Sequence, residues 1–213
     1  MISGAMEKSN CRPAIIPQKI ILASANPDKA KEFQKMLPEN LYQVIPMHEA
    51  GFSDAIEENG ASYQENALIK ARAVFSRLGG LVLADDSGLS IDVLQGAPGL
   101  YSARFAGEGA DYPTKISCLY RYLRPWPPNE WLASFVCALA LIKPDGSEIT
   151  VVRECRGLIA PHPRGSNGFG YDPIFLLPDR GKTMAELPED EKNEISHRGQ
   201  ALRALASLLL DRD

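Results

Sequence analysis

The sequence predicts an α/β fold with a mixed β-sheet. In the first half of the chain, short apolar segments typical of buried strands alternate with helical segments, and in the second half two long β-like segments flank a turn. Alternating strands and helices favour parallel pairing, whereas strands joined by a tight turn pair antiparallel. With 213 residues, the chain has the size of one domain or of two small lobes around one core.

The first predicted strand, residues 19–24, leads directly into a helix over residues 29–37. Asn26 is a favoured N-cap, and Pro27 follows at the first helical position, where its missing N–H costs nothing. Residues 42–46 form the second predicted strand. The chain therefore opens with a strand, a tight turn, a helix and a strand.

A longer helix is expected to begin at Ser62, which forms a capping box with Glu65, and to end at Gly79. The apolar residues 81–84 predict a buried strand that runs into two aspartates, and residues 89–94 alternate loosely, as a further strand would. The sequence thus places the aspartates at the end of a strand.

The second half of the chain contains a predicted helix over residues 113–124, broken by the prolines that follow. Two β-like segments, residues 131–143 and 148–160, flank the turn signal of residues 144–147 and predict a hairpin. A last helix is expected over residues 198–210. Residues 18–213 are therefore interpreted as one domain, and residues 1–17 as a short extension.

The composition excludes several classes of protein. The net charge is 23 − 27 = −4, which disfavours binding to nucleic-acid polymers, and no apolar run approaches the ~18–20 residues of a membrane span. The four cysteines are widely spaced, without a zinc or disulfide pattern, and are interpreted as free thiols. The N-terminal residues lack the apolar core of a signal peptide, so we expect a cytoplasmic protein.

The first strand is followed by three polar side chains in the pattern Ser24-x-Asn26-x-x-Lys29. Free backbone N–H groups at a helix start favour an anion, and a lysine there supplies the point charge that a phosphate needs. The plainer alternative is that Asn26 only caps the helix and that Lys29 is a solvated surface residue. The chain has no Walker P-loop pattern.

Two pairs of carboxylates are candidates for metal binding: Glu57 with Glu58, and Asp85 with Asp86. Aspartates after an apolar strand are expensive to bury unpaired, which indicates a role in binding. Asp86, with Glu57 or Glu58, would suit Mg²⁺ through oxygens and water, and a nearby carboxylate would take a proton from an attacking water. The alternative is a solvated loop and a turn cap.

A glycine-rich segment, residues 165–173, contains Phe169 and Tyr171 between glycines. Such a loop approaches something closely or turns sharply, and an aromatic ring on it offers a face on which a nucleobase stacks. The alternative is that these aromatic residues fold back into the core. Close to the last helix, Lys192, His197 and Arg198 bring further donors to a helix start.

In combination and in this order, these motifs resemble the inosine triphosphate pyrophosphatase family, the pyrophosphatases of non-canonical purine nucleoside triphosphates. The resemblance covers about residues 18–211. The matching stretches are SANPDK (24–29), EENG (57–60), ENA (65–67), ADDSG (84–88), GAPGLYSAR (96–104), GFGYDP (168–173) and SHRG (196–199). Ser24 stands where threonine is common in the family and keeps the hydroxyl.

The resemblance implies an elongated mixed sheet flanked by helices, with two lobes and a central active-site cleft. It implies an Mg²⁺-dependent hydrolase that converts ITP, dITP or XTP to the nucleoside monophosphate and pyrophosphate, and a homodimer. Asp86 would be the proton acceptor and a metal ligand, together with Glu57 or Glu58 and Asp85, and Lys29 would assist catalysis. The implied substrate-binding residues are Ser24, Asn26, Lys29, Ser87, Arg104, Phe169, Gly170, Tyr171, Asp172, Lys192, His197 and Arg198.

Three other functions remain as alternatives. A house-cleaning pyrophosphatase of the Maf type would act on pyrimidine or modified nucleotides, and the FGYD (169–172) and SHRG (196–199) motifs argue against it. A Nudix hydrolase needs a glutamate-rich R-E-x-x-E-E helix, which the sequence lacks. A non-catalytic nucleotide sensor would not need the full set of carboxylates.

Overall fold

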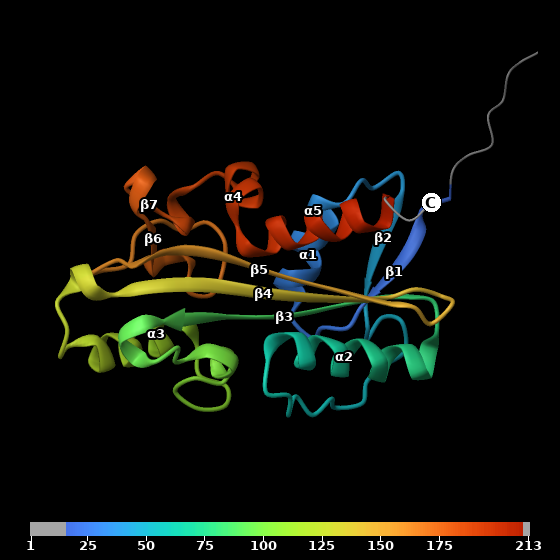
Figure 1. Ribbon diagram of the computed structural model, residues 1–213, viewed down its shortest axis with the longest axis horizontal. Coiled ribbons are helices and arrows are strands. Elements are labelled where there is room, and N and C mark those ends of the chain that lie inside the picture. Colours follow the sequence, from blue (N-terminus) through green and yellow to red (C-terminus); the bar gives the residue numbers. More distant parts are fainter. Residues whose placement is uncertain (1–15, 211–213) are drawn as a thin grey trace, which may run out of the picture.

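The computed structural model describes residues 16–210, so all but the last two residues of the predicted extension 1–17 lie outside the described residues. Seven strands form one mixed sheet in the order β2-β1-β3-β4-β5-β6-β7 (Figure 1). The strands are β1 (Gln18–Leu22), β2 (Tyr42–Pro46), β3 (Leu81–Ile91), β4 (Leu132–Ile142), β5 (Glu148–Ile159), β6 (Phe175–Leu177) and β7 (Lys182–Thr183). The α-helices are α1 (Pro27–Met36), α2 (Tyr63–Leu78), α3 (Tyr112–Leu123), α4 (Glu189–Ile195) and α5 (His197–Leu210).

The predicted helix starts are confirmed by their caps. The Asn26 side chain accepts a hydrogen bond from the Asp28 N–H at 2.9 Å, and Ser62 accepts one from the Glu65 N–H at 3.1 Å. Both bonds satisfy backbone donors that the first turn of a helix leaves unpaired. At its other end, α2 stops at Gly79, which has a φ of +63°.

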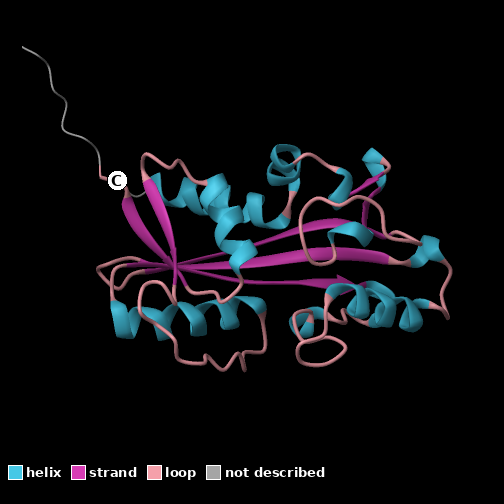
Figure 2. Ribbon diagram, turned by 180° about the vertical axis from the view of Figure 1, so that it is seen from behind, coloured by secondary structure: helices cyan, strands magenta, loops and turns pink. Residues whose placement is uncertain are grey.

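The sheet is parallel at one edge and antiparallel elsewhere. β1 pairs in parallel with β2 and with β3, while β3, β4 and β5 pair antiparallel over ten or more residues each. These three long strands run the length of the molecule and give it an elongated shape (Figures 1 and 2). The predicted mixed sheet and hairpin are both confirmed.

The prediction of two strands on either side of Asp85 and Asp86 is wrong. Leu81–Ile91 is a single strand, and both aspartates lie in its middle. The reason is tertiary: β1 leaves the sheet after Leu22, opposite Leu83, but β4 continues to pair with β3 through Ile91. The aspartates therefore lie just beyond the carboxyl end of β1, next to the turn that starts α1.

Helices cover both faces of the sheet. Figure 1 shows α2 and α3 on one face and α1 and α5 on the other. Three groups of buried apolar residues follow from this arrangement: one beneath α1 and α5, one beneath α2, and one at the far end, around α3 and β6. The far-end group and the other two correspond to the two expected lobes.

The short elements β6, β7 and α4 were not predicted from the sequence. They span two to seven residues and lack the periodicity that identifies longer elements. Within residues 16–210, the helices are too short or too polar to cross a lipid bilayer.

Candidate active site

A cavity of about 600 Å³ opens where β1 leaves the sheet, between the two lobes. Its walls come from the β1–α1 turn, the loop before α2, α2 itself, the middle of β3, the segment after Gly99, the glycine-rich loop and the start of α5. The residues that border it include most of the predicted site residues: Ser24, Asn26, Lys29, Glu58, Asp86, Ser87, Arg104, Phe169, Gly170, Tyr171, Asp172, Lys192, His197 and Arg198. Segments far apart in the sequence therefore meet at one site.

The β1–α1 turn presents its polar groups at one end of the cavity. Ser24 accepts a hydrogen bond from the Asn26 N–H at 3.2 Å, and the Asn26 side chain is held by the Asp28 N–H. Lys29, in the first turn of α1, extends to Asp85, where it forms an ion pair and also donates to the backbone carbonyl at 3.4 Å. The helix start and Lys29 together make this end of the cavity favourable for an anion.

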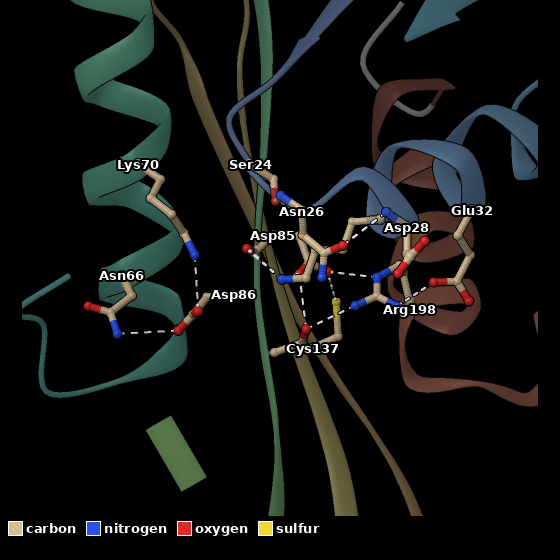
Figure 3. Close-up of polar contacts among 12 residues, drawn as sticks. Ser24, Asn26, Asp28, Glu32, Asn66, Lys70, Asp85, Asp86, Cys137 and Arg198 are labelled. Carbon is tan, nitrogen blue, oxygen red and sulfur yellow. Dashed lines mark hydrogen bonds and ion pairs between the residues drawn. The ribbon is translucent and has the colours of Figure 1, made fainter. Parts of the chain in front are cut away.

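Asp86 lies on the α2 side of β3 and has two donors from α2. Lys70 donates to its Oδ1 at 3.0 Å and Asn66 to its Oδ2 at 3.2 Å (Figure 3). The same ammonium contacts Glu58 at 2.7 Å, so Lys70 joins two carboxylates across the cavity wall. Burial raises the pKa of Asp86 above its ordinary value, although Lys70 opposes this shift.

Lys70 was missed by the sequence analysis. Burial acts to lower its pKa, but the charges of Asp86 and Glu58 outweigh that effect, so the pKa of Lys70 is raised and the ammonium stays charged. Its position in the sequence was a signal for a buried charged residue. Lys70 lies beside Ala67, Ala71 and Val74 on the buried side of α2, where an unpaired lysine would be costly.

Glu58 and Glu57 lie in different environments. Glu58 borders the cavity and contacts Lys70, whereas Glu57 borders a separate hollow behind the loop, next to Ile69 and Arg77. Of this pair, the structure brings only Glu58 to Asp86. The geometry thus separates two glutamates that the sequence left equivalent.

Asp85 faces the opposite side of β3 from Asp86 and is completely buried. Arg198 donates to its Oδ2 through Nε at 2.9 Å (Figure 3). Lys29 pairs with its Oδ1. These two cations outweigh the effect of burial and hold the pKa of Asp85 well below its ordinary value, so the carboxylate is ionised. Asp85 does not border the cavity.

A second residue missed from the sequence, Glu32, links Arg198 to Lys192. Glu32 is buried, pairs with the Arg198 guanidinium, and lies 3.3 Å from the Lys192 ammonium. Lys192 in turn contacts Asp172 at 2.8 Å. Glu32 lies three residues after Lys29, on the same side of α1, and this spacing was the only sequence signal.

These contacts form a chain of alternating charges across one wall of the site: Lys29, Asp85, Arg198, Glu32, Lys192 and Asp172. Asp172 and Glu32 raise the pKa of Lys192 against the effect of burial, and burial raises the pKa of Asp172. Each buried charge therefore has an opposite partner, as buried ions require.

Both aromatic residues of the glycine-rich loop border the cavity, but they differ in burial. Phe169 is half-buried at the cavity, with its ring centroid 5.1 Å from the Lys192 ammonium and 5.5 Å from the Arg198 guanidinium carbon. Tyr171 is 4% exposed, packs in the far-end core, and donates its hydroxyl to the Ser102 carbonyl at 3.2 Å. The sequence analysis considered that the aromatic residues of this loop fold back into the core, and the Tyr171 side chain does so.

Gly168 is where the loop requires glycine. Its φ is +73°, and a Cβ atom there would collide with Oδ2 of Asp172. That oxygen accepts the Phe169 N–H at 2.8 Å and the Lys192 ammonium. The absence of a side chain thus lets the backbone fold around the Asp172 carboxylate.

His197 and Arg198 begin α5, where the Ser196 side chain accepts the Gly199 N–H at 3.1 Å. The His197 ring stacks on the Phe135 ring, with the ring centroids 4.8 Å apart. Its Nδ1 has no hydrogen-bond partner among the described residues. Burial, together with the charge of Arg198, holds the pKa of His197 well below its ordinary value, so the imidazole is neutral. A neutral ring with a free nitrogen at a cavity wall is suited to a polar ligand.

Two remaining predicted residues lie at the edge of this network. Ser87 accepts a hydrogen bond from Arg198 at 2.9 Å and borders the cavity. Arg104 is exposed at the cavity mouth, with its guanidinium 4.8 Å from the centre of the Tyr101 ring. It has no carboxylate partner among the described residues and is therefore available to an anion.

Comparisons with known proteins agree with this fold. The sequence profile of the Ham1 family matches residues 20–208, and the chain belongs to this family. It is 48% identical over 195 residues to the dITP/XTP pyrophosphatase of Bacillus subtilis, covering 92% of this chain and 98% of that protein. The resemblance predicted from the motifs is confirmed.

Two solved structures have the same fold. A HAM1 protein from Coxiella burnetii is 42% identical, with a TM-score of 0.81 over 91% of this chain and 99% of its own. The Ham1 protein of Staphylococcus aureus is 38% identical, with a TM-score of 0.81 over 92% and 100% of the two chains.

Proposed function

We propose that this protein hydrolyses the non-canonical purine nucleoside triphosphates dITP, XTP and ITP to the nucleoside monophosphate and pyrophosphate. The observation that carries the proposal is one cavity bordered by both cations and a pair of carboxylates. Lys29, Arg198 and Lys192 supply the cations, and Asp86 with Glu58 supplies the carboxylates. Membership of the Ham1 family, with dITP/XTP pyrophosphatases among its relatives, supports the same activity.

Glu58 and Asp86 are the residues that would hold Mg²⁺. Within residues 16–210, the His, Cys, Asp and Glu side chains do not gather in groups of three or more that would hold a metal by themselves. Mg²⁺ usually binds through one or two carboxylates plus substrate phosphates and water, and these two carboxylates, joined by the Lys70 ammonium, fit that donor set. When bound, the metal supplies charge neutralisation and a Lewis acid at the phosphates.

Asp86 is the group that would accept the proton of the attacking water. Its raised pKa makes it a stronger base than an exposed aspartate, while Lys70 keeps enough of it ionised to act. The new bond joins the water oxygen to the α-phosphorus. The anhydride bond between the α- and β-phosphates breaks, and pyrophosphate leaves. Lys29 and Arg198 stabilise the charge that develops on the phosphate oxygens.

The base would lie against Phe169, near Lys192, Asp172 and His197. Hypoxanthine and xanthine carry a 6-oxo group where adenine carries an amine, so N–H donors at that position favour them. A donor that faces the amine of ATP is left unmatched, which costs roughly 1–3 kcal/mol and gives ~10–100-fold discrimination. Arg198 already donates to Asp85, Glu32 and Ser87, so its remaining N–H groups and the loop backbone are the donors available.

A homodimer is the assembly we propose for this chain. Exposed aromatic residues occur on this part of the surface: Tyr101, which contacts Arg104, is 61% exposed, and Tyr122 is 58% exposed and packs against Phe105 with ring centroids 5.9 Å apart. Such exposed rings next to Arg104 are typical of a protein interface. Size-exclusion chromatography with light scattering tests this: a mass near 47 kDa, twice the 23.3 kDa chain, is expected, and 23.3 kDa would contradict it.

The activity is tested by adding ITP, dITP or XTP and Mg²⁺ to the purified chain and identifying both products. Pyrophosphate and the nucleoside monophosphate are expected, with kcat/KM at least about tenfold above that for ATP. Release of phosphate with IDP would mean that the wrong bond has been assigned. Faster turnover of dTTP or UTP would favour the Maf-type alternative, and no turnover of any nucleotide would favour the sensor.

A further inference from the structure

Asp85 and Asp86 are neighbours in β3, but their side chains serve opposite faces of the sheet. Successive residues of a strand point to opposite sides, so Asp85 shares its face with Leu83 and Cys137, and Asp86 shares its face with Ala84. Asp86 borders the cavity, whereas Asp85 is 0% exposed and does not. A metal bound in the cavity would therefore reach only Asp86 of the two.

The Asp85 carboxylate already has a full set of donors. Lys29 and the Ser87 hydroxyl, at 3.0 Å, contact its Oδ1. The Arg198 Nε at 2.9 Å and the Cys137 thiol at 3.2 Å contact its Oδ2. Each carboxylate oxygen has about two lone pairs, so these contacts leave none free for a metal.

The donors of Asp85 come from four separate elements. Lys29 lies in α1, Ser87 in β3, Cys137 in β4 and Arg198 in α5. Lys29 and Arg198 both border the cavity, and without a carboxylate between them these two cations would repel each other. Asp85 therefore fixes the positions of the Lys29 ammonium and the Arg198 guanidinium at the cavity.

We propose that Asp85 is a positioning residue, which holds Lys29 and Arg198 in place for the substrate phosphates and does not ligate the metal. The inference rests on the proposed function. It revises the expectation from the sequence, which grouped Asp85 with Glu57, Glu58 and Asp86 as metal ligands. It also gives Cys137 a role as one of the four donors, beyond filling space in the core.

The first experiment compares Asp85→Asn with Asp86→Asn by two measurements. Mn²⁺ binding without nucleotide is followed by electron paramagnetic resonance, and kcat and KM for ITP are measured at saturating Mg²⁺. Asp85→Asn is expected to bind Mn²⁺ within about twofold of the parent and to raise KM about tenfold or more, since a hydrogen bond to a charged group is lost on each cation. Asp86→Asn is expected to weaken Mn²⁺ binding about tenfold and to abolish turnover.

Loss of Mn²⁺ affinity in Asp85→Asn, equal to that in Asp86→Asn, would overturn the proposal. An unchanged KM in Asp85→Asn would overturn it as well. If the parent chain binds Mn²⁺ but hydrolyses no nucleoside triphosphate, the proposed function fails, and KM is replaced by the Kd of a non-hydrolysable ITP analogue. The two failures are therefore distinguishable.

A milder variant covers the case in which Asp85→Asn does not fold. Cys137→Ala removes one donor of Asp85 without touching either cation, and Cys137→Ser keeps a donor at the same place. Because a thiol is a weak donor, Cys137→Ala is expected to raise KM about three- to tenfold, with kcat within about twofold. Cys155→Ala, a buried thiol away from the cavity, is the matched control and is expected to change neither constant.

Rescue by the conservative variant separates positioning from packing. Cys137→Ser is expected to restore KM to within about twofold of the parent, because its hydroxyl also donates to the carboxylate. A serine variant with the same KM as the alanine variant would overturn the role of the thiol. So would an alanine variant that lowers only the thermal stability, which is measured for all three variants.

Discussion

The ammonium of Lys70 lies 3.0 Å from Oδ1 of Asp86, on a helix that faces the middle of β3. This contact joins a side chain from α2 to the residue proposed as the proton acceptor. It also opposes the effect of burial on the pKa of Asp86. The ionisation of the proposed base therefore depends on a lysine from another element.

Lys70→Met is expected to lower kcat for ITP by about 100-fold at pH 7, in the range for loss of a general base. Without the ammonium, burial raises the pKa of Asp86 further, so less of it is ionised. The acidic limb of the kcat/KM profile should consequently move to higher pH. The exposed Lys182 provides the control: Lys182→Met should leave rate and profile unchanged. A Lys70→Met variant with the parent profile would contradict this dependence.

Glu58 and Glu57 are predicted to differ in metal dependence. Glu58→Gln removes a carboxylate that borders the cavity, and should raise the Mg²⁺ concentration for half-maximal activity by about tenfold or more. Glu57 is adjacent in sequence but borders the hollow behind the loop. Glu57→Gln should therefore leave the Mg²⁺ concentration for half-maximal activity within about twofold of that of the parent. Mg²⁺ titrations of the initial rate measure both. Equal effects of the two substitutions would exclude Glu58 as the preferred ligand.

Much of the fold could be predicted because its signals are local. Asn26 and Ser62 cap helices in the structure as their sequence contexts indicate, and the turn around Gly146, with a φ of +83°, closes the predicted hairpin. The continuous β3 strand could not be predicted, because two aspartates in an apolar strand look like its end. Pairing with β4, which starts some fifty residues later, carries the strand through them.

The candidate site, like the fold, could be predicted from the sequence only in part. Motifs identified many of the polar residues that border the cavity, since each motif presents several polar groups at one turn. Glu32 and Lys70 were not found, because a charged residue in a helix looks solvated unless its partner is known. Their partners lie far away in sequence: Arg198 is 166 residues from Glu32, and Asp86 is 16 residues from Lys70.

Gly168→Ala is predicted to damage both stability and binding. A positive φ alone costs an alanine about 1 kcal/mol, and the contact with Asp172 adds about 1–3 kcal/mol of overpacking. Displacing Asp172 also disturbs Lys192, so KM for ITP should rise. Gly181→Ala is the matched control, since Gly181 has a φ of +63° and open space around its Cβ position. Denaturant unfolding and steady-state kinetics distinguish the two, and equal losses in both variants would refute the role of the Asp172 contact.

His197 is predicted to make the folded state less stable in mild acid. Its pKa is lowered well below the ordinary value in the folded protein, so below about pH 6.5 the unfolded chain binds a proton that the folded chain does not. The contribution of His197 to the free energy of unfolding is therefore largest above pH 6.5. It falls as pH decreases toward the folded pKa, by at most about 1.4 kcal/mol per pH unit.

The measurement is urea unfolding between pH 5 and pH 8 for the parent chain and for His197→Gln, a neutral side chain of similar size. The glutamine variant should show a shallower fall below pH 6.5, because it has no proton to take up on unfolding. His162→Gln, at an exposed position, should retain the slope of the parent. Parallel curves for the parent and His197→Gln would mean that the folded protein protonates this imidazole at the same pH as the unfolded chain does, so that the ring is charged in mild acid. In that state it would add to the positive charge of Arg198, instead of offering the cavity a neutral ring with a free Nδ1.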